Sequence, residues 1–593
     1  MRNAIPKEIS IIVSIDNKIT NKKNYLFKDA AKTIIANNPS EIESALNLID
    51  EYTNQGKYLC GYFSYEASCY LKGLHVSLLD NGMPMVWFGV FDNPILIQDE
   101  KVSNDYYLTE FKASKDFKNY SEGFKKIKKY IEDGVVYQIN YTFGLHFSFY
   151  GDQTSLFYDL KQNQKSSYNF MFSFDDKHIL SLSPELLFYK NNRKILTKPM
   201  KGTISRNSNP IIDQANKEKL RNSLKNKAEN AMITDILRND LGIICEHGTI
   251  QVEKYLEIEE YPTLYQMTST VSGTLKKEIR YKEIFKAMFP IASITGAPKI
   301  EAMKKISEIE NEKRGIYTGA IGIIQPNGEA IFNVAIRTLE LNKSKGRICV
   351  GSGIVYDSDE IDEYNESLLK ASFITLNKKE FYLFETMLFK HKKITLLNLH
   401  LERLKKSAIY FNFRYYEDKI LTAINEIIVT CIQYNKNVRI KLKLYPDGKM
   451  QVEHKPVENI FLKKNQPYRL ALSNEKINSK DVFNYHKTNL RQLKDEKYRG
   501  AIDLGFNEVI FINEKDEVTE CCVHNIAMES GGRWYTPPLI SGLLPGTFRQ
   551  YLLNKKYLVE RKISMDDLKK ADKILLINSV RGFNQGELSD QLL

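Results

Sequence analysis

The sequence predicts an α+β fold in which two domains follow one another along the chain. The first observation is its length of 593 residues, since one domain holds about 150. The second is the composition, 42% hydrophobic and 27% charged, which is typical of globular proteins and excludes disordered and collagen-like chains. The third is a pattern of strands and helices that restarts after the polar stretch TLNKKEF. We therefore place the domains at 1–375 and 376–593.

The predicted first domain mixes strands with helices. The alternating stretches FGLHFSFY (143–150) and HILSLS (178–183) predict strands. A helix over 118–134 is expected to end at Gly134, and a helical block over 217–242 is expected to end at Gly242. Later helices are predicted over 280–289, after Pro298 and from Asp359 to Phe373, with the strands TGAIGII, AIFNVAIRTLEL and RICVGSGIVY among them.

The predicted second domain repeats this alternation on a smaller scale. It begins with the strand-like FYLFETMLF and continues through the helical stretches LHLERLKKSAIYF and EDKILTAINEIIVTCI. Strand-like VRIKLKLY follows. A stretch rich in glycine and proline (531–553) then precedes a closing helix.

Charge and cysteine content exclude several classes of protein. Lys and Arg number 85 against 73 Asp and Glu, a net charge of +12 that is scattered along the chain as on a solvated surface. No basic run interleaved with aromatics and no zinc-finger or RNA-binding signature predicts a nucleic-acid partner. Seven cysteines without a C-x-x-C pair favour a reducing compartment. With neither a signal peptide nor an 18-residue apolar run, we expect a cytoplasmic protein without a membrane partner.

Acidic residues of the first domain form a candidate metal site. Glu363, Glu366 and Lys370 are spaced i, i+3 and i+7, on one face of a predicted helix. Two carboxylates one turn apart can share Mg²⁺ and leave room for substrate, although a solvated charged face is the ordinary alternative. Three further candidates are Glu185, Glu229 and the backbone-constrained lysine of TKPMKGT, Lys201.

Eight ordered stretches of the first domain resemble one enzyme family. They are VYQINYT, SPELLF, TKPMKGT, ENAMITDILRNDLG, PIASITGAPKIEAM, RGIYTGAIG, FNVAIRT and GSGIVYDSDEIDEYNESLLKA. Over about 60–375 the chain resembles the chorismate-using enzymes, which include anthranilate synthase component I and aminodeoxychorismate synthase component I. The resemblance implies a large antiparallel β-sandwich with helices.

The resemblance also implies the roles of residues around chorismate. Mg²⁺ would be held by Glu229 and Glu366 with Glu363 beside it, and Glu185 would protonate the departing hydroxyl. The ring carboxylate would meet N–H groups of a Gly351–Ser352–Gly353 turn. The remaining substrate-binding residues implied are Thr203, Thr295, Tyr317, Arg337 and Lys370, with Gln266 at a position where several relatives carry His.

Lys201 distinguishes members of the family. Enzymes resembling aminodeoxychorismate synthase carry lysine in P-x-K-G-T, whereas anthranilate synthases have a small residue there. A lysine amine can attack ring C2, after which ammonia displaces a group at C4 and 4-amino-4-deoxychorismate results. No Gly-x-Cys-x-Gly turn of a glutamine amidotransferase occurs in the 593 residues. A separate glutaminase subunit is therefore expected to supply ammonia, the alternative being free ammonia.

The second domain contains the groups that would hold pyridoxal phosphate (PLP). A helix N-terminus at Thr547 together with Arg403 could bind a phosphate. Lys487 could form a Schiff base and Glu520 could pair with a pyridinium nitrogen. Taken one at a time, Arg403, Lys487 and Glu520 are better explained as ordinary surface charges, and only their combination points to PLP.

Five stretches of the second domain, taken in order, again resemble an enzyme family. LFETMLF, HLERLKKSA, HKTNLR, NEVIFINEKDEVTECCVHNI and TPPLISGLLPGTFR resemble fold-type IV PLP enzymes over about 381–593. These include branched-chain and D-amino-acid aminotransferases and aminodeoxychorismate lyase. The resemblance implies a two-lobed α/β domain in which Lys487 carries PLP, Glu520 faces its ring nitrogen, and Arg403 and Thr547 bind its phosphate. The supporting positions implied are His400, Asn525 and Gly546, with Arg581 near a substrate carboxylate.

The order of the two domains implies consecutive reactions. The first would form 4-amino-4-deoxychorismate, and the second would expel pyruvate to leave 4-aminobenzoate for folate synthesis. Two alternatives stay open: an anthranilate synthase-like domain fused to an aminotransferase, and a C-terminal domain without catalysis. A homodimer through the C-terminal domain is also expected.

Overall fold

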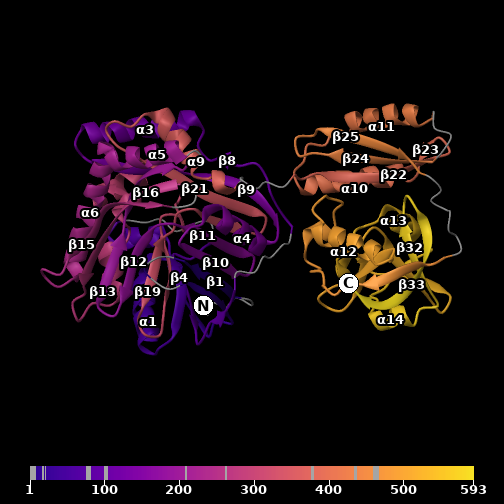
Figure 1. The fold of residues 1–593 in the computed structure, drawn as a ribbon, viewed down its shortest axis with the longest axis horizontal. Coiled ribbons are helices and arrows are strands. Elements are labelled where there is room, and N and C mark those ends of the chain that lie inside the picture. Colours follow the sequence, from indigo (N-terminus) through magenta and orange to yellow (C-terminus); the bar gives the residue numbers. More distant parts are fainter. Residues whose placement is uncertain are drawn as a thin grey trace. The chain divides into compact units, whose positions relative to one another are not determined.

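The computed structural model divides the chain into two compact units (Figure 1). It describes residues 9–16, 19, 22–74, 82–98, 105–207, 210–260, 264–374, 380–432, 437–457 and 466–593. The first unit comprises Met1–Val102, Leu108–Phe149 and Leu156–Lys378. The second comprises Lys379–Leu593 and two short segments, Ser103–Tyr107 and Tyr150–Ser155, that come from earlier in the sequence.

One sheet of the first unit has eleven strands among the described residues. Its order is β17-β9-β21-β20-β11-β10-β1-β2-β6, with β7 and β8 also paired to β9. The strands are β1 (Ile9–Ile15), β2 (Lys23–Lys28), β6 (Ile95–Leu96), β7 (Tyr106–Leu108), β8 (Lys112–Ala113), β9 (Gln138–Gly151), β10 (Tyr168–Phe174), β11 (Lys177–Ser183), β17 (Gly296–Ala297), β20 (Thr338–Asn342) and β21 (Lys345–Ile354).

The other sheet, with ten described strands, has the order β14-β16-β13-β12-β19-β18-β4-β5-β3, and β15 pairs with β16. The strands are β3 (Lys32–Ala36), β4 (Tyr58–Phe63), β5 (Val86–Phe91), β12 (Leu186–Asn191), β13 (Lys194–Lys198), β14 (Met200–Ser205), β15 (Gln251–Glu260), β16 (Leu264–Thr274), β18 (Ala320–Ile324) and β19 (Ala330–Val334).

A buried aromatic core joins the two sheets. Trp87 of β5 stacks on Phe174 of β10 with ring centroids 5.1 Å apart, and Phe172 meets Trp87 edge-on at 6.0 Å. A second core lies on the other face of the β5 sheet, where helices α1 (Ile42–Asn54), α6 (Leu224–Ile244) and α7 (Tyr281–Met288) cover it. The predicted antiparallel β-sandwich with helices is confirmed.

Most predicted helices of this unit form within a few residues of their expected bounds. Helix α3 (Phe117–Glu132) is followed by Gly134 at φ +69°, α8 (Lys299–Ile309) follows Pro298, and Asp359 caps α9 (Glu360–Leu369) by accepting hydrogen bonds from two N–H groups. The other helices of the unit are α2 (Tyr65–Leu71), α4 (Gln153–Gln164) and α5 (Pro210–Asn222).

Two details of the first unit differ from prediction. The block over 217–242 is two helices, because Ser223 leaves the helical conformation and its hydroxyl accepts from the Asn226 N–H to cap α6. Gly242 lies inside α6, which continues to Ile244. Residues 351–353 form no turn. They lie in β21, where Gly351 pairs with Thr142 and Gly353 with Asn140 of β9.

The second unit has two lobes, as predicted. The smaller lobe is the sheet β23-β22-β24-β25, and helices α10 and α11 share one hydrophobic core with alternate residues of β22 and β24. Its elements are β22 (Leu383–Lys390), β23 (Lys393–Ile394), β24 (Val438–Leu444), β25 (Met450–Pro456), α10 (Leu397–Tyr410) and α11 (Glu417–Ile432). The predicted linker partly falls on 375–379, outside the described residues.

The larger lobe is the sheet β28-β27-β26-β33-β32-β29-β30-β31. Its elements are β26 (Tyr468–Leu472), β27 (Glu508–Ile512), β28 (Val518–Cys521), β29 (Asn525–Ser530), β30 (Arg533–Thr536), β31 (Val559–Glu560), β32 (Lys573–Asn578), β33 (Gly582–Leu592), α12 (Gln492–Asp503), α13 (Thr547–Asn554) and α14 (Met565–Lys569). The chain ends in β33 where a closing helix was predicted, because β33 pairs with both β26 and β32 inside the sheet. No described helix is both long and apolar enough to cross a bilayer.

Candidate active sites

Lys201 lies on β14, where a glycine brings the strand against a helix. Gly202 has φ +86°, and a Cβ there would lie 2.9 Å from side-chain atoms of Asn226 on α6. This close approach sets Lys201 near Glu229 of the same helix. Burial lowers the pKa of Lys201, although the negative charge of Glu229 opposes the shift. Burial therefore shifts the equilibrium of this amine toward its neutral, nucleophilic form.

Glu185 is a buried carboxyl group in the same region. It lies between β11 and β12, 3% exposed, and its Oε1 accepts a 2.7 Å hydrogen bond from the Ser293 hydroxyl. Burial raises its pKa to about 7, while Ser293 and the positive charge of Lys201 oppose the rise. A carboxyl group with this pKa can carry a proton at neutral pH, as a general acid requires.

Gln138 of β9 borders the same space and was missed from the sequence. It is 1% exposed, and neither its Oε1 nor its Nε2 has a hydrogen-bond partner. A Cβ on Gly353 would lie 2.7 Å from Gln138 Nε2 and 3.5 Å from Lys201 Nζ. Glycine at 353 thus leaves a space between a polar amide and the lysine. The available signal was a glutamine inside an otherwise buried strand.

Helix α9 supplies the acidic residues. Glu366 Oε1 lies 2.8 Å from Lys370 Nζ, which also donates to the Gly351 carbonyl at 2.9 Å. Burial would raise the pKa of Glu366, but Lys370 and Lys201 outweigh it and the pKa is lowered. Glu363 Oε1 accepts from the Ser358 hydroxyl at 2.7 Å. Glu366 is thus held as an anion.

The residues implied for Mg²⁺ are only partly assembled. Glu229 and Glu366 both act electrostatically on Lys201, so two carboxylates from different helices face one region. Within the described ranges no group of three His, Cys, Asp or Glu side chains is arranged to hold a metal. Two carboxylates fit Mg²⁺, which commonly keeps several waters and takes further oxygens from its substrate.

At Gly351–Gly353, strand β21 has a partner strand on one side only among the described residues. Strand β21 pairs with β20 only as far as Ile348, while its pairing with β9 continues to Ile354. Backbone N–H groups on the unpaired edge could therefore still meet a carboxylate. The Ser352 hydroxyl donates to the Glu363 carbonyl at 3.3 Å, which joins this edge to α9.

Two threonines stand in different surroundings. Thr203 donates to Gln266 Oε1 at 2.9 Å, and Gln266 Nε2 donates to the Gly202 carbonyl at 2.9 Å. Gln266 therefore holds the strand that carries Lys201. Thr295 is fully buried and its hydroxyl donates to the Ile291 carbonyl.

Tyr317 and Arg337 have different surroundings. Tyr317 is buried, and its pKa is raised by that burial, with Arg314 opposing and Glu185 contributing to the rise. It therefore belongs to the region of Glu185. Arg337 has φ +51° and donates to Gln164 Oε1 on α4.

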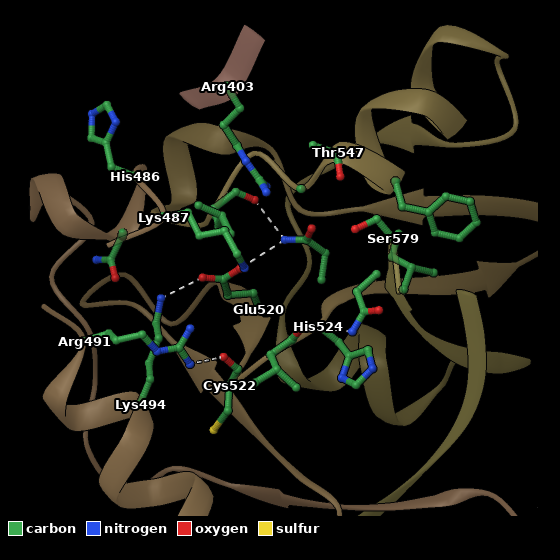
Figure 2. Close-up of a pocket in the computed structure, with 18 of the residues that line it drawn as sticks. Arg403, His486, Lys487, Arg491, Lys494, Glu520, Cys522, His524, Thr547 and Ser579 are labelled. Atoms are coloured by element: carbon green, nitrogen blue, oxygen red, sulfur yellow. Dashed lines mark hydrogen bonds and ion pairs between the residues drawn. The ribbon is translucent and has the colours of Figure 1, made fainter. Parts of the chain in front are cut away.

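In the second unit, a cavity between the two lobes surrounds Lys487 (Figure 2). The Phe384 N–H of β22 donates to the Lys487 carbonyl at 3.0 Å, which fixes the backbone, and Nζ lies 5.0 Å from the Phe384 ring centre. Burial, followed by the charge of Arg403, lowers the pKa of Lys487 to about 7. About half of such amines are neutral at pH 7 and can attack an aldehyde.

Glu520 of β28 is anchored through both carboxylate oxygens. Its Oε2 accepts from Asn525 Nδ2 at 3.0 Å, and its Oε1 lies 2.6 Å from Lys494 Nζ on α12. Asn525 also donates to the Leu544 carbonyl at 2.9 Å. Lys494 is a second residue missed from the sequence, where it was one lysine among many.

The N-terminus of α13 forms a cradle for an anion. Gly546 precedes the helix, and a Cβ there would lie 1.8 Å from Asn525 Oδ1. Thr547 begins it, 3% exposed, with its Oγ1 3.3 Å from His400 Nε2. Helix N-termini present unpaired N–H groups and a partial positive charge, which suit phosphate.

Arg403 is oriented by a buried acid that the sequence reading did not single out. Glu385 of β22 accepts from Arg403 Nε at 2.8 Å and Nη2 at 2.7 Å, and lies 2.6 Å from His400 Nδ1. Burial would raise the pKa of Glu385, but Arg403 and His400 lower it to about 2. Arg403 Nη1 donates to the Pro545 carbonyl at 3.1 Å, beside the α13 cradle. Each terminal nitrogen carries a second N–H for an anion.

The residues of this cavity fit PLP. An amine with a pKa near 7, a fixed carboxylate and a helix N-terminus with an arginine line one space, as Figure 2 shows for Lys487, Glu520, Arg403 and Thr547. These groups match the aldehyde, the ring nitrogen and the phosphate. Arg581 precedes β33, and its N–H donates to Asn578, a cavity residue.

Comparison with known families matches both parts. Residues 98–376 match the family of chorismate binding enzymes, and residues 382–585 match amino-transferase class IV.

Curated relatives of the first part carry two names. Anthranilate synthase component 1 of Saccharolobus solfataricus is 35% identical over 327 residues, which cover 52% of this chain and 77% of that protein. Aminodeoxychorismate synthase component 1 of Escherichia coli is 34% identical over 271 residues, 46% of this chain and 60% of that protein.

Solved structures agree on the fold. Anthranilate synthase component I from Streptococcus pneumoniae superposes with a TM-score of 0.51 at 24% identity, covering 63% of this chain and 94% of that chain. The menaquinone-specific isochorismate synthase of Escherichia coli gives 0.50 at 15% identity, covering 63% and 89%. The chain therefore belongs to the family of chorismate binding enzymes and carries a class IV amino-transferase domain after that part.

Proposed function

We propose that this chain makes 4-aminobenzoate from chorismate and ammonia in two consecutive reactions. Residues 1–375 would replace the ring hydroxyl of chorismate by an amino group and release water. Residues 376–593 would then eliminate pyruvate from 4-amino-4-deoxychorismate. The observation that carries the first assignment is the buried Lys201 amine, with its lowered pKa, in the same region as the protonatable Glu185.

In the first reaction, Glu185 would donate its proton to the departing hydroxyl. Lys201 would attack ring C2 as the neutral amine, and ammonia arriving at C4 would displace it. Tyr317, Arg337, Thr203, Thr295 and the edge at Gly351–Gly353 would bind the substrate, whose carboxylates Lys370 would help to neutralise. These roles are supported by the position of Glu185, Lys201 and Glu366 around one region.

Mg²⁺ is proposed as the metal of this site. Glu229 and Glu366 would hold it, with Glu363 beside them. When bound, Mg²⁺ would neutralise the ring carboxylate and stabilise charge that develops as the hydroxyl leaves. The lowered pKa of Glu366 supports the assignment because a metal ligand must be ionised.

PLP is proposed as the cofactor of the second site, where it would withdraw electrons from the carbon that bears the amino group. Lys487 would hold it and then remove the proton at C4 of the substrate. Glu520, held by Asn525, would face the ring nitrogen, and Arg403, Gly546 and Thr547 would bind the phosphate. Formation of the aromatic ring would favour loss of pyruvate.

Partners and location complete the proposal. We expect a separate glutamine amidotransferase subunit to deliver ammonia, and a homodimer through the C-terminal domain. A cytoplasmic location suits its seven cysteines, all buried free thiols, because a reducing compartment keeps cysteines in that form.

Product analysis tests the proposal. The protein would be loaded with PLP and incubated with chorismate, Mg²⁺ and ammonium, and the products separated by chromatography. We expect 4-aminobenzoate and pyruvate in equal amounts. Lys487→Ala should stop at 4-amino-4-deoxychorismate, and Lys194→Ala, an exposed lysine on β13, should behave as the parent. Anthranilate as the main product would overturn the proposal.

A second candidate calls for the same assay because one relative bears another name. Identity of 35% to an anthranilate synthase component 1 is as high as that to the aminodeoxychorismate synthases. Under this alternative the first domain would form anthranilate, and the class IV domain would act as an aminotransferase on another substrate. Lys201 argues against it, since a lysine that bonds to C2 blocks the position that anthranilate formation must aminate. Product identity decides between them.

A further inference from the structure

Lys494 and Glu520 form a buried ion pair in the lining of the cavity that surrounds Lys487. Nζ and Oε1 are 2.6 Å apart, and the two side chains are 11% and 7% exposed. Figure 2 shows Lys494 reaching Glu520 from the side opposite to Arg403. The other oxygen of Glu520 accepts from Asn525 at 3.0 Å. Lys494 therefore completes the fixation of a carboxylate that the proposed reaction needs, while having no part in that reaction itself.

Stability alone gives little reason for this pair. Taking both charges out of water costs free energy that their attraction only partly offsets, so apolar residues of similar size often serve as well. Removing one partner is different, because it leaves an isolated charge in the interior. A buried carboxyl group without a nearby cation then tends to take up a proton.

The same helix provides a comparison. Lys497 of α12 pairs with Glu475 at 2.8 Å, and that glutamate is 60% exposed. An ion pair that is open to water on one side contributes little to stability. Lys494 differs because its partner is buried and lines the cavity.

We propose that Lys494 is a positioning residue for the cofactor, which holds Glu520 in place so that it can receive the ring nitrogen of PLP. This inference rests on the proposed PLP function of the second site. Lys494 acts through Glu520: its hydrogen bond, together with that of Asn525, fixes the direction of both carboxylate oxygens. The ring nitrogen of PLP would then meet an acceptor whose direction is already set.

A double-mutant cycle on PLP affinity tests the inference. Apo-protein would be titrated with PLP and followed by the visible absorbance band and by quenching of intrinsic fluorescence. We expect Lys494→Met to weaken binding about tenfold in the parent and less than twofold in Glu520→Gln, since Lys494 acts through Glu520. Lys494→Arg should bind within about threefold of the parent. Lys497→Met is the matched control and should bind as the parent does.

Thermal unfolding of the apo-protein gives a readout that needs no cofactor. Lys494→Met should lower the melting temperature by several degrees, because it leaves the buried Glu520 carboxylate without its partner. Lys494→Met with Glu520→Gln should recover much of that loss, since no charge is then left alone in the interior. A side chain that only fills space would give the same loss whether residue 520 is Glu or Gln.

The outcomes separate this inference from the proposed function. If the parent protein binds no PLP, the proposed function of the second site fails. If the parent binds PLP but Lys494→Met weakens binding equally in the parent and in Glu520→Gln, the inference fails and Lys494 acts independently of Glu520. If Lys494→Met does not fold, the double variant should still fold and melt close to Glu520→Gln alone, and a double variant that also fails to fold would overturn the inference.

Discussion

The hydroxyl of Ser293 donates a 2.7 Å hydrogen bond to Oε1 of Glu185. This bond favours the ionised carboxylate, whereas burial favours the protonated acid, and burial prevails with a pKa of about 7. The Ser293 hydroxyl thus lowers the pKa of Glu185, and a mutation that removes it should change the pH at which Glu185 titrates.

We expect the first reaction to follow the protonation of Glu185. Its rate should fall as pH rises through about 7, because the acid that protonates the hydroxyl is lost. Ser293→Ala removes a bond to the ionised form, so the pKa should rise and the falling limb should move to higher pH. Glu185→Gln should slow the reaction about 100-fold or more. The measurement is the initial rate of chorismate loss from pH 5.5 to 9, with the exposed Ser307→Ala as control. A limb that does not move in Ser293→Ala contradicts the assignment.

Lys201 should react at a lower pH than an ordinary lysine. Competitive labelling with an acylating reagent, read by mass spectrometry, would compare it with the exposed Lys194 in the same digest. Glu229→Gln should shift the Lys201 profile to still lower pH, because Glu229 raises the pKa of that amine. An unchanged profile would show that Glu229 does not act on Lys201.

Incorporation of PLP should depend on the neutral amine of Lys487. With a pKa of about 7, its neutral fraction rises about tenfold between pH 6 and pH 8, and the rate of incorporation should rise with it. Stopped-flow absorbance on apo-protein would measure this rate. Lys487→Ala, which has no such amine, should give no slow absorbance change at any pH, and a flat profile in the parent would contradict the prediction.

Gly546 should tolerate no side chain. A Cβ would lie 1.8 Å from Asn525 Oδ1, so Gly546→Ala must displace Asn525 and with it one hydrogen bond to Glu520. We expect PLP affinity to fall about tenfold or more in equilibrium titration. Gly500→Ala in α12 is the matched control, since nothing lies within 4 Å of the added atom. Unchanged affinity in Gly546→Ala would mean that the cradle does not bind the phosphate.

The sequence predicted the fold class and most helix bounds because those signals are local. Gly134, Pro298 and Asp359 each mark a helix end through their own backbone or side-chain chemistry. Ser223 was missed because a continuous helical pattern hid one capping hydroxyl. The pattern of RICVGSGIVY predicted a strand through Gly351–Gly353, and the turn that the resemblance implied there was wrong because pairing with β9 continues through both glycines.

Residues of the two sites could be predicted where residue type and sequence motif suffice. Lys487 and Glu520 line one cavity, and their roles remain a proposal. Glu385 and Lys494 were not singled out, because an acid in a strand and a lysine in a helix become informative only when the fold buries them beside Arg403 and Glu520. Such partners are distant in sequence and leave no spacing to detect.

The buried amide of Gln138 has no hydrogen-bond partner within the described part of the protein, which lowers the stability of the fold. Burying two polar atoms without partners costs about 1–3 kcal/mol each, which a leucine of similar size would avoid. The free energy of unfolding is thus lowered by the residue that borders Lys201 and Gly353. Selection for stability alone would be expected to replace this glutamine by an apolar residue, so its presence indicates a requirement other than stability at position 138.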